Sequence, residues 1–209
     1  MTSRQVTLYY VHDPMCSWCW GFAPVWQEVR ERLTDSPVQV KYLLGGLAAD
    51  SDQPMPQEMQ ITLQGIWRRI QQHIPGTEFN FDFWTRCQPR RSTWPACRAV
   101  LAAARQQQEQ TMISAIQQAY YLRALNPSDD EVLVQLAVEL GLDGERFAAD
   151  LNSTEIRETL QQQMQLAHSM PINGFPSLVL QTGQGYRPLP LDYHSAQNIL
   201  DGLSALLEA

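Results

Sequence analysis

The sequence contains few cysteines and no long apolar run. Four cysteines in 209 residues are far too few for a small scaffold that disulfides hold together. No apolar run approaches the ~18 residues that a membrane-spanning helix needs, and residues 1–10 lack the apolar core of a secretory signal. We therefore expect a cytosolic protein without membrane contact, whose cysteines serve a chemical purpose.

Basic residues are scarce as well. The chain carries 15 Lys and Arg against 22 Asp and Glu, which gives a formal net charge of -7. This balance argues against a nucleic-acid-binding protein, because such proteins hold phosphates with Lys and Arg. Apolar residues, in contrast, make up 44% of the chain. That is enough for one packed domain, or for a compact core with one large insertion.

Strand patterns occur near the two ends of the chain. Val6–Val11 and Val38–Leu44 are rich in β-branched and aromatic residues, and residues 22–33 between them repeat apolar side chains at helical spacing. Pro176–Gln181 predicts a third strand, Tyr186–Leu189 a short partner strand, and an apolar helical stripe ends the chain. The order of elements is therefore β-α-β followed, much later, by β-β-α.

The middle of the chain is almost free of strand patterns. Amphipathic stripes at helical spacing recur through residues 46–170, and Ser128 with Glu131 predicts a capping box at the start of one helix. We therefore expect an α/β protein in which residues 1–45 and 171–209 form a sheet-containing domain. Residues 46–170 form a helical insertion domain.

Cys16 and Cys19 form a Cys-x-x-Cys pair where the first predicted strand meets the following helix. Unpaired amide hydrogens and the helix dipole favour a thiolate at a helix N-terminus, and the thiolate is the nucleophile in disulfide exchange. The second cysteine, three positions on, can attack a mixed disulfide formed on the first. The alternative is half of a zinc site, but Cys87 and Cys97 are not spaced as a second Cys-x-x-Cys.

The segment Asp13–Phe22, with the sequence Asp-Pro-Met-Cys-Ser-Trp-Cys-Trp-Gly-Phe, resembles the DsbA-like thioredoxin superfamily, and within it the cytosolic FrnE-like branch of disulfide oxidoreductases and isomerases. The resemblance implies a thioredoxin-like fold with a large α-helical insertion between the second strand and the cis-proline strand. It also implies Cys16 as the nucleophile and Cys19 as the resolving thiol. We expect no metal, because a metal would block the nucleophile, and no separate cofactor.

The same resemblance implies a cis-proline opposite the cysteine pair, and Pro176 occupies that place. A cis bond there turns the backbone of Phe175 toward the cysteines, free to pair with an extended substrate. Family members more often carry a small or β-branched residue at the position of Phe175. Trp18, between the cysteines, is expected to be exposed and to contact apolar substrates, whereas Trp20 is expected to pack into the fold.

His12 and a group of arginines are further candidates. His12 is interpreted as an ordinary loop histidine, with tuning of the thiols as the alternative. Residues 86–98 hold four arginines, and Ser92–Arg98 resembles a segment that faces the active site in the wider superfamily, which includes kappa-class glutathione transferases. Our hypothesis is that Arg90 and Arg91 line the substrate entrance and favour acidic partners or glutathione carboxylates. The alternative is a solvated loop.

Cys87 and Cys97 have three interpretations. They are buried free thiols, or a second disulfide, or part of a zinc site shared with Cys16 and Cys19.

The sequence thus predicts a thiol-disulfide oxidoreductase or isomerase that acts on a disulfide- or dithiol-containing protein, or on a small thiol such as glutathione. One alternative is a glutathione transferase or isomerase like the kappa class, which uses serine where Cys16 stands. The other is a non-enzymatic redox-sensing or zinc-binding module. The direction of electron flow and the oligomeric state do not follow from the sequence.

Overall fold

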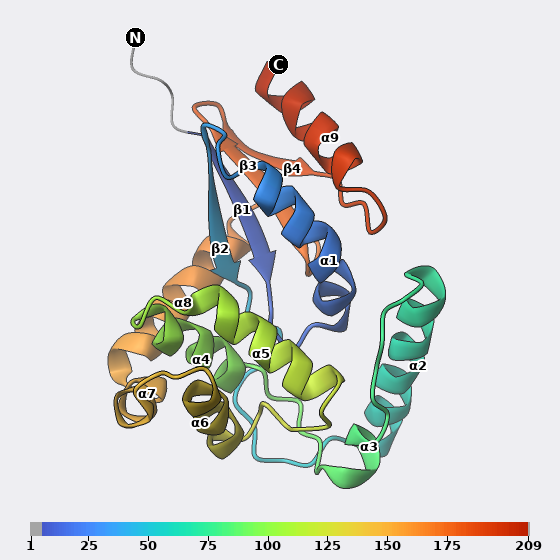
Figure 1. The fold of residues 1–209 in the computed structure, drawn as a ribbon, viewed down its shortest axis with the longest axis vertical. Coiled ribbons are helices and arrows are strands. Elements are labelled where there is room, and N and C mark those ends of the chain that lie inside the picture. Colours follow the sequence, from blue (N-terminus) through green and yellow to red (C-terminus); the bar gives the residue numbers. More distant parts are fainter. Residues whose placement is uncertain (1–5, 209) are drawn as a thin grey trace.

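The computed structural model describes residues 6–208 and joins one sheet to a large group of helices (Figure 1). Within these residues the sheet has four strands in the order β2-β1-β3-β4. Residues 1–5 and 209, which we expected in the sheet-containing domain, lie outside the described residues. The strands are β1 (Val6–His12), β2 (Val38–Leu44), β3 (Ser177–Thr182) and β4 (Gly185–Leu189), and the helices are α1 (Ser17–Arg32), α2 (Gln57–His73), α3 (Phe83–Arg86), α4 (Trp94–Ala104), α5 (Glu109–Tyr121), α6 (Asp130–Glu139), α7 (Gly144–Leu151), α8 (Thr154–His168) and α9 (Ala196–Glu208).

Strand β1 is buried on both faces, which explains its continuous apolar pattern. Leu8 and Tyr10 belong to a cluster with side chains of α1 and α9. Tyr9 and Val11 point to the opposite face, in a cluster with the end of α8. Helices α1 and α9 therefore cover one face of the sheet, and α8 lies against the other (Figure 1).

The strand directions bring two distant segments to one edge of the sheet. β1 is parallel to β2 and antiparallel to β3, so the end of β1 meets the beginning of β3. Val11 pairs with Ser177 in this register. As a result, the Cys-x-x-Cys segment after β1 lies beside Pro176, the residue that precedes β3.

Residues 46–170 form the helical part of the chain, between β2 and β3, as the sequence predicted. All of these residues are described, and they contain no strand, only one isolated bridge between Pro54 and Arg90. Their helices bury large apolar side chains in one cluster, among them Trp67, Ile116 and Leu136. The fold class, an α/β protein with a helical insertion after the second strand, is thus confirmed.

The predicted capping box at Ser128 and Glu131 is wrong. Helix α6 begins one residue later, with Asp129 at its N-cap and no side-chain cap. Ser128 is buried and its hydroxyl donates instead to the carbonyl oxygen of Ser92, at 2.7 Å. The hydroxyl pairs with a backbone carbonyl of a distant loop, because folding brings residues 92 and 128 together. The local sequence pattern does not reveal this contact.

The apolar side chains fall mainly into two clusters. One combines the sheet with α1 and α9, and the other fills the helical part and takes in Met15 and Leu44 from the edge of the sheet. No helix within residues 6–208 is long and apolar enough to span a bilayer.

Candidate active site at Cys16 and Cys19

Cys16 occupies the N-cap of α1, directly before the first helical residue. Its backbone amide donates to the carbonyl oxygen of Asp13 at 3.0 Å, which closes the turn between β1 and the helix. Its side chain is 7% exposed, and its thiol donates to the carbonyl oxygen of Phe175 at 3.4 Å. The cysteine therefore lies at the meeting point of the two segments that the sheet brings together.

Cys19 lies one turn further along α1 and is fully buried. Burial raises the pKa of its thiol well above the ordinary value, and a hydrogen bond with Cys16 adds to the effect. The two cysteines are therefore unequal. Cys16 lies at a helix N-terminus with a small part of its surface exposed, whereas Cys19 is fully buried and favours its protonated form.

The peptide bond between Phe175 and Pro176 is cis, as the resemblance implies. Pro176 is buried and Phe175 is half-buried. The ring of Phe175 packs closely over Gly45, where even one added carbon atom would come within 2.0 Å of the ring. A glycine at position 45 therefore makes room for the large side chain that distinguishes this loop.

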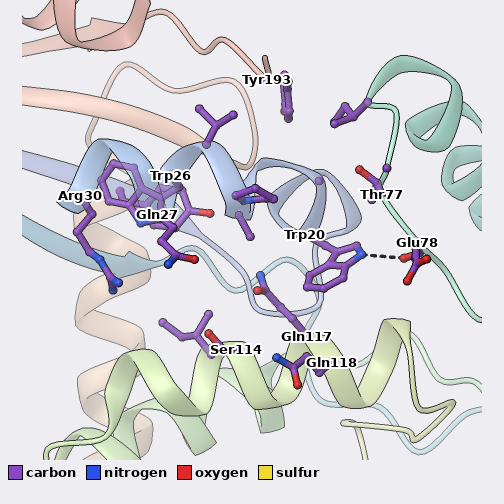
Figure 2. A pocket seen from close by; sticks show the side chains of 18 of the residues that line it. Trp20, Trp26, Gln27, Arg30, Thr77, Glu78, Ser114, Gln117, Gln118 and Tyr193 are labelled. Carbon is purple, nitrogen blue, oxygen red and sulfur yellow. Dashed lines mark hydrogen bonds between the residues drawn. The ribbon is translucent and has the colours of Figure 1, made fainter. Parts of the chain in front are cut away.

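Trp18 is half-buried rather than fully exposed. Its ring lies 5.4 Å from that of Tyr193 and 5.9 Å from that of His73, both in edge-on geometry. Trp20 packs into the fold, as predicted: it stacks on Tyr121 at 5.7 Å. The indole nitrogen of Trp20 also donates to the carbonyl oxygen of Glu78 (Figure 2).

Asp13 is a site residue that sequence reasoning missed. It is fully buried, and burial raises the pKa of its carboxyl group. One carboxylate oxygen accepts from the amide of Met15 at 2.8 Å. The other accepts from the amide of Leu47 at 2.7 Å, the hydroxyl of Thr93 at 2.7 Å and the thiol of Cys97 at 3.5 Å. This carboxylate ties the loop before Cys16 to the helical part of the chain.

Two signals in the sequence relate to this network. Asp13 lies in the segment that carries the family resemblance, and Thr93 lies in the segment that resembles an active-site-facing region. A second tie comes from Tyr121 at the end of α5, whose hydroxyl donates to the carbonyl oxygen of Met15 at 2.7 Å. Nothing in the local sequence pattern distinguishes this tyrosine from an ordinary core residue.

His12 is not a loop residue, so that interpretation is wrong. It is the last residue of β1 and is fully buried, because the strand extends one residue beyond its apolar run. Its ring stacks on Tyr10 at 4.9 Å, and neither ring nitrogen has a hydrogen-bond partner. Burial lowers the pKa of His12 to about 3, so the ring is neutral at ordinary pH.

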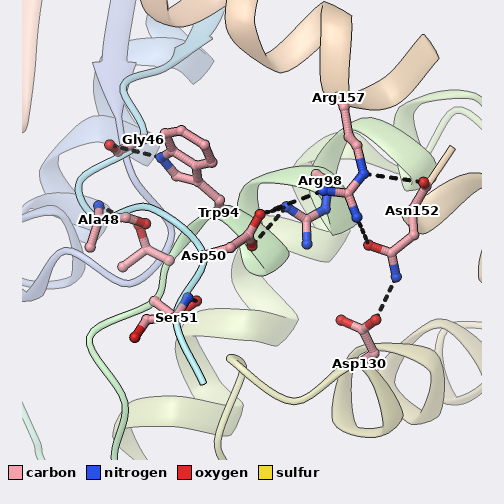
Figure 3. Close-up of polar contacts among 11 residues, drawn as sticks. Gly46, Ala48, Asp50, Ser51, Trp94, Arg98, Asp130, Asn152 and Arg157 are labelled. Carbon is pink, nitrogen blue, oxygen red and sulfur yellow. Dashed lines mark hydrogen bonds and ion pairs between the residues drawn. The ribbon is translucent and has the colours of Figure 1, made fainter. Parts of the chain in front are cut away.

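The arginines of residues 86–98 are engaged within the helical part of the chain. The guanidinium of Arg90 donates to Asp129 at 2.6 Å and to the carbonyl oxygen of Ser128 at 2.5 Å. Arg98 is 4% exposed and pairs with Asp50 at 2.8 Å (Figure 3). Among residues 6–208, the cleft that Arg90 and Arg98 line includes neither cysteine of the pair. Arg91 is half-buried, and its place at a substrate entrance stays a prediction.

Cys87 and Cys97 are free thiols in the structure, so they form no second disulfide. Cys97 is fully buried, and its thiol donates to Asp13. Cys87 is half-buried and donates to the carbonyl oxygen of Ala124 at 3.1 Å. Within residues 6–208 no group of three or more His, Cys, Asp or Glu side chains is arranged to hold a metal ion.

Comparison with known proteins places this geometry in a wider group. The family model of the DSBA-like thioredoxin domain matches residues 6–194. A candidate protein disulfide isomerase from Nitrosomonas europaea superposes with a TM-score of 0.84, at 29% identity over 98% of both chains. The cytosolic disulfide reductase DsbM from Pseudomonas aeruginosa superposes with a TM-score of 0.76, at 26% identity over 97% of this chain and 98% of DsbM. DsbM has also been solved with GSH.

The ClpXP adapter protein SpxH from Bacillus subtilis is 26% identical over 197 residues, which cover 85% of this chain. SpxH from Halalkalibacterium halodurans is 22% identical over 84% of this chain. The matched regions span 64% and 58% of the two adapter proteins.

Proposed function

Because the chain belongs to the DSBA-like thioredoxin domain family, we propose that it is a thiol-disulfide oxidoreductase in which Cys16 attacks the substrate and Cys19 resolves the mixed disulfide. The observation that carries this proposal is the inequality of the two thiols. Cys16 is at a helix N-terminus beside the Phe175 carbonyl, and Cys19 is buried one turn behind it.

The reaction proceeds in two exchanges. The Cys16 thiolate attacks one sulfur of a substrate disulfide, forms a mixed disulfide and releases the other substrate sulfur as a thiolate, which takes up a proton. Cys19 then loses its proton and attacks the sulfur of Cys16. The Cys16–Cys19 disulfide forms, the second substrate thiol leaves, and two electrons have passed to the substrate. Oxidation of a dithiol runs through the same steps in reverse.

Burial of Cys19 separates these steps in time. A thiol with a raised pKa is a poor nucleophile toward solvent, so Cys19 does not compete with Cys16 for incoming disulfides. The mixed disulfide places an electrophilic sulfur directly beside Cys19, where proximity compensates for its low thiolate fraction.

The segment before β3 supplies the substrate contact. In the free protein the carbonyl oxygen of Phe175 accepts a hydrogen bond from the Cys16 thiol. The backbone of an extended substrate would pair with the same carbonyl group and replace that hydrogen bond. The half-buried rings of Phe175 and Trp18 flank this position and supply apolar contacts. Arg90 is ion-paired with Asp129, so acidic substrates depend on Arg91 or on rearrangement of that pair.

The partner is a disulfide- or dithiol-containing protein, or a small thiol such as glutathione. The solved complex of DsbM with GSH supports a small thiol, and the cytosolic location of DsbM supports the same location for this chain. Residues 1–45 and 171–209 serve as the redox domain, and residues 46–170 cover its active edge. The two apolar clusters support that division.

Reduction of insulin or of glutathione disulfide by the purified protein tests the proposal. Cys16→Ser abolishes the exchange, whereas Cys19→Ser accumulates a mixed disulfide that mass spectrometry detects. Cys87→Ser is the matched control, because Cys87 is half-buried and lies outside the pair, and it retains the exchange. Exchange that survives in Cys16→Ser contradicts the proposal, and glutathione conjugation without disulfide exchange favours the kappa-class alternative.

A further inference from the structure

A cavity lies between α1, α5 and the loop that follows α2 (Figure 2). We call it the α1–α5 cavity. Its volume is about 710 Å³, which is within the range of small-molecule sites. Among residues 6–208, neither Cys16 nor Cys19 lines it. The two redox sulfurs therefore lie outside the lining of the cavity.

Gln117 is the polar group that points to a ligand. It lies on α5, is 4% exposed and lines the cavity. No residue within 6–208 forms a hydrogen bond with its side-chain amide. Within residues 6–208 the amide atoms of Gln117 are not among the fully buried polar atoms that lack a partner, so they face the open space of the cavity. A ligand that offers both a donor and an acceptor can therefore pair with them. A peptide group is such a ligand.

Two opposite charges mark the ends of the cavity. Figure 2 shows Arg30 at one end and Glu78 at the other, and they are the only Arg, Lys, Asp or Glu side chains of residues 6–208 that line it. Arg30 donates to the neutral partners Gln110 and Tyr42. Within the described residues neither Arg30 nor Glu78 takes part in an ion pair, although eight other pairs occur there. Within the described residues no opposite charge therefore neutralises either group, and Arg30 is held only by neutral partners.

Aromatic side chains form the wall between these ends. Trp26 is 5% exposed, Trp20 is half-buried and is held by its hydrogen bond to the Glu78 backbone, and Tyr193 lies across the cavity from α5 (Figure 2). These rings suit an apolar side chain. A purely apolar ligand would leave Gln117 unpaired, and a polyanion would meet one arginine and a carboxylate.

We propose that the α1–α5 cavity binds a short peptide with free ends. Its carboxylate lies at Arg30, its ammonium group at Glu78 and an internal peptide group at Gln117. The proposal goes beyond the disulfide chemistry and is independent of it, because the cavity contains neither redox sulfur. Trp20 follows Cys19 directly, so an occupied cavity also supports the helix that carries the pair.

Calorimetric titration of the full chain with the tripeptide Gly-Leu-Gly tests the site, together with its N-acetylated and C-amidated forms. The unmodified peptide binds, and each blocked form binds about tenfold more weakly because it loses one charge-assisted contact. In Glu78→Gln acetylation no longer weakens binding, and in Arg30→Gln amidation no longer does. Gln117→Met, which keeps the size of the side chain but removes the amide, weakens all three peptides alike.

Arg32→Gln is the matched control. Arg32 is on the same helix, is ion-paired with Glu28 at 3.6 Å and does not line the cavity, so its substitution leaves binding unchanged. A Cys16→Ser, Cys19→Ser double variant also retains binding, and Arg30→Gln retains disulfide exchange, which separates this proposal from the redox function. No binding of the unmodified peptide at millimolar concentration, or equal binding of the blocked and unblocked forms, overturns the proposal.

Discussion

The thiol of Cys16 and the carbonyl oxygen of Phe175 lie 3.4 Å apart, although 159 residues separate them in the sequence. The antiparallel pairing of β1 and β3 creates this contact, because it places the end of one strand beside the beginning of the other. The attacking sulfur and the backbone acceptor that it contacts thus share one edge of the sheet. The behaviour of the four thiols, and of the residues that hold this edge, follows from that arrangement.

Alkylation of the native, reduced protein by iodoacetamide near pH 7 is expected to modify Cys16 before Cys19 and Cys97. The last two are fully buried, and burial raises the pKa of both thiols well above the ordinary value, so neither presents a thiolate to the reagent. Peptide mapping by mass spectrometry measures the order. In urea all of the cysteines react alike, which serves as the control. Native-state labelling of Cys19 as fast as that of Cys16 contradicts the inequality.

Replacement of His12 by phenylalanine is expected to make the free energy of unfolding less dependent on pH below about pH 6.5. Burial lowers the pKa of His12 to about 3, against about 6.5 in an unfolded chain. The unfolded state therefore takes up a proton first as the pH falls. This linkage removes about 4 kcal/mol of stability between pH 6.5 and pH 3, and urea unfolding at several pH values measures the difference between the two proteins.

At pH 7 the same variant should be at least as stable as the parent. Neither ring nitrogen of His12 has a hydrogen-bond partner, so no bond is lost, and a phenyl ring retains the stacking on Tyr10. Asp13 is present in both proteins, so its contribution to the pH dependence of stability cancels in the comparison. An unchanged pH dependence in His12→Phe shows that the histidine does not cause it.

Removal of the Asp13 carboxylate is expected to loosen the loop before Cys16. Asp13→Ala leaves the amide of Leu47 and the buried hydroxyl of Thr93 without their acceptor, at a cost of about 3 kcal/mol. Urea unfolding measures this loss, and disulfide exchange should fall with it because Cys16 is no longer held beside Phe175. Asp35→Asn, at an exposed position, is the control and changes neither quantity. Full activity in a destabilised Asp13→Ala protein would limit the aspartate to a role in folding.

The sequence predicted the strands well because their signals are local. Val6–Val11 and Val38–Leu44 are rich in β-branched and aromatic residues, and the observed strands match them to within one residue. The cysteine pair was equally visible, since its spacing and its place at a strand-to-helix junction are local features. The helical part followed from repeated apolar spacing in the same way.

Several features that the sequence did not reveal depend on distant contacts. The carboxylate of Asp13 meets Thr93 across 80 residues, and the hydroxyl of Ser128 meets Ser92 across 36. In the sequence, the buried Asp13 and the buried Ser128 cannot be told apart from surface residues. Arg90 was expected at the substrate entrance, yet it lies against Asp129 because the carboxylate is 39 residues away in the sequence and adjacent in space.

Gly45→Ala is expected to act through Phe175. A Cβ atom at position 45 would come within 2.0 Å of the Phe175 ring, so the ring must move or the loop must shift, at a cost of about 1–3 kcal/mol. The displaced ring would also disturb the contact between Cys16 and the Phe175 carbonyl, so disulfide exchange falls together with stability.

Phe175→Val alone removes only part of the apolar contact. In the double variant, Gly45→Ala should cost much less than in the parent, because the smaller side chain no longer meets the new methyl group. A double-mutant cycle of urea unfolding measures this coupling. Gly65→Ala is the control, since a methyl group there meets nothing within 4 Å and alanine favours the helix. Additive effects at positions 45 and 175 would show that the glycine is not there to accommodate the phenylalanine.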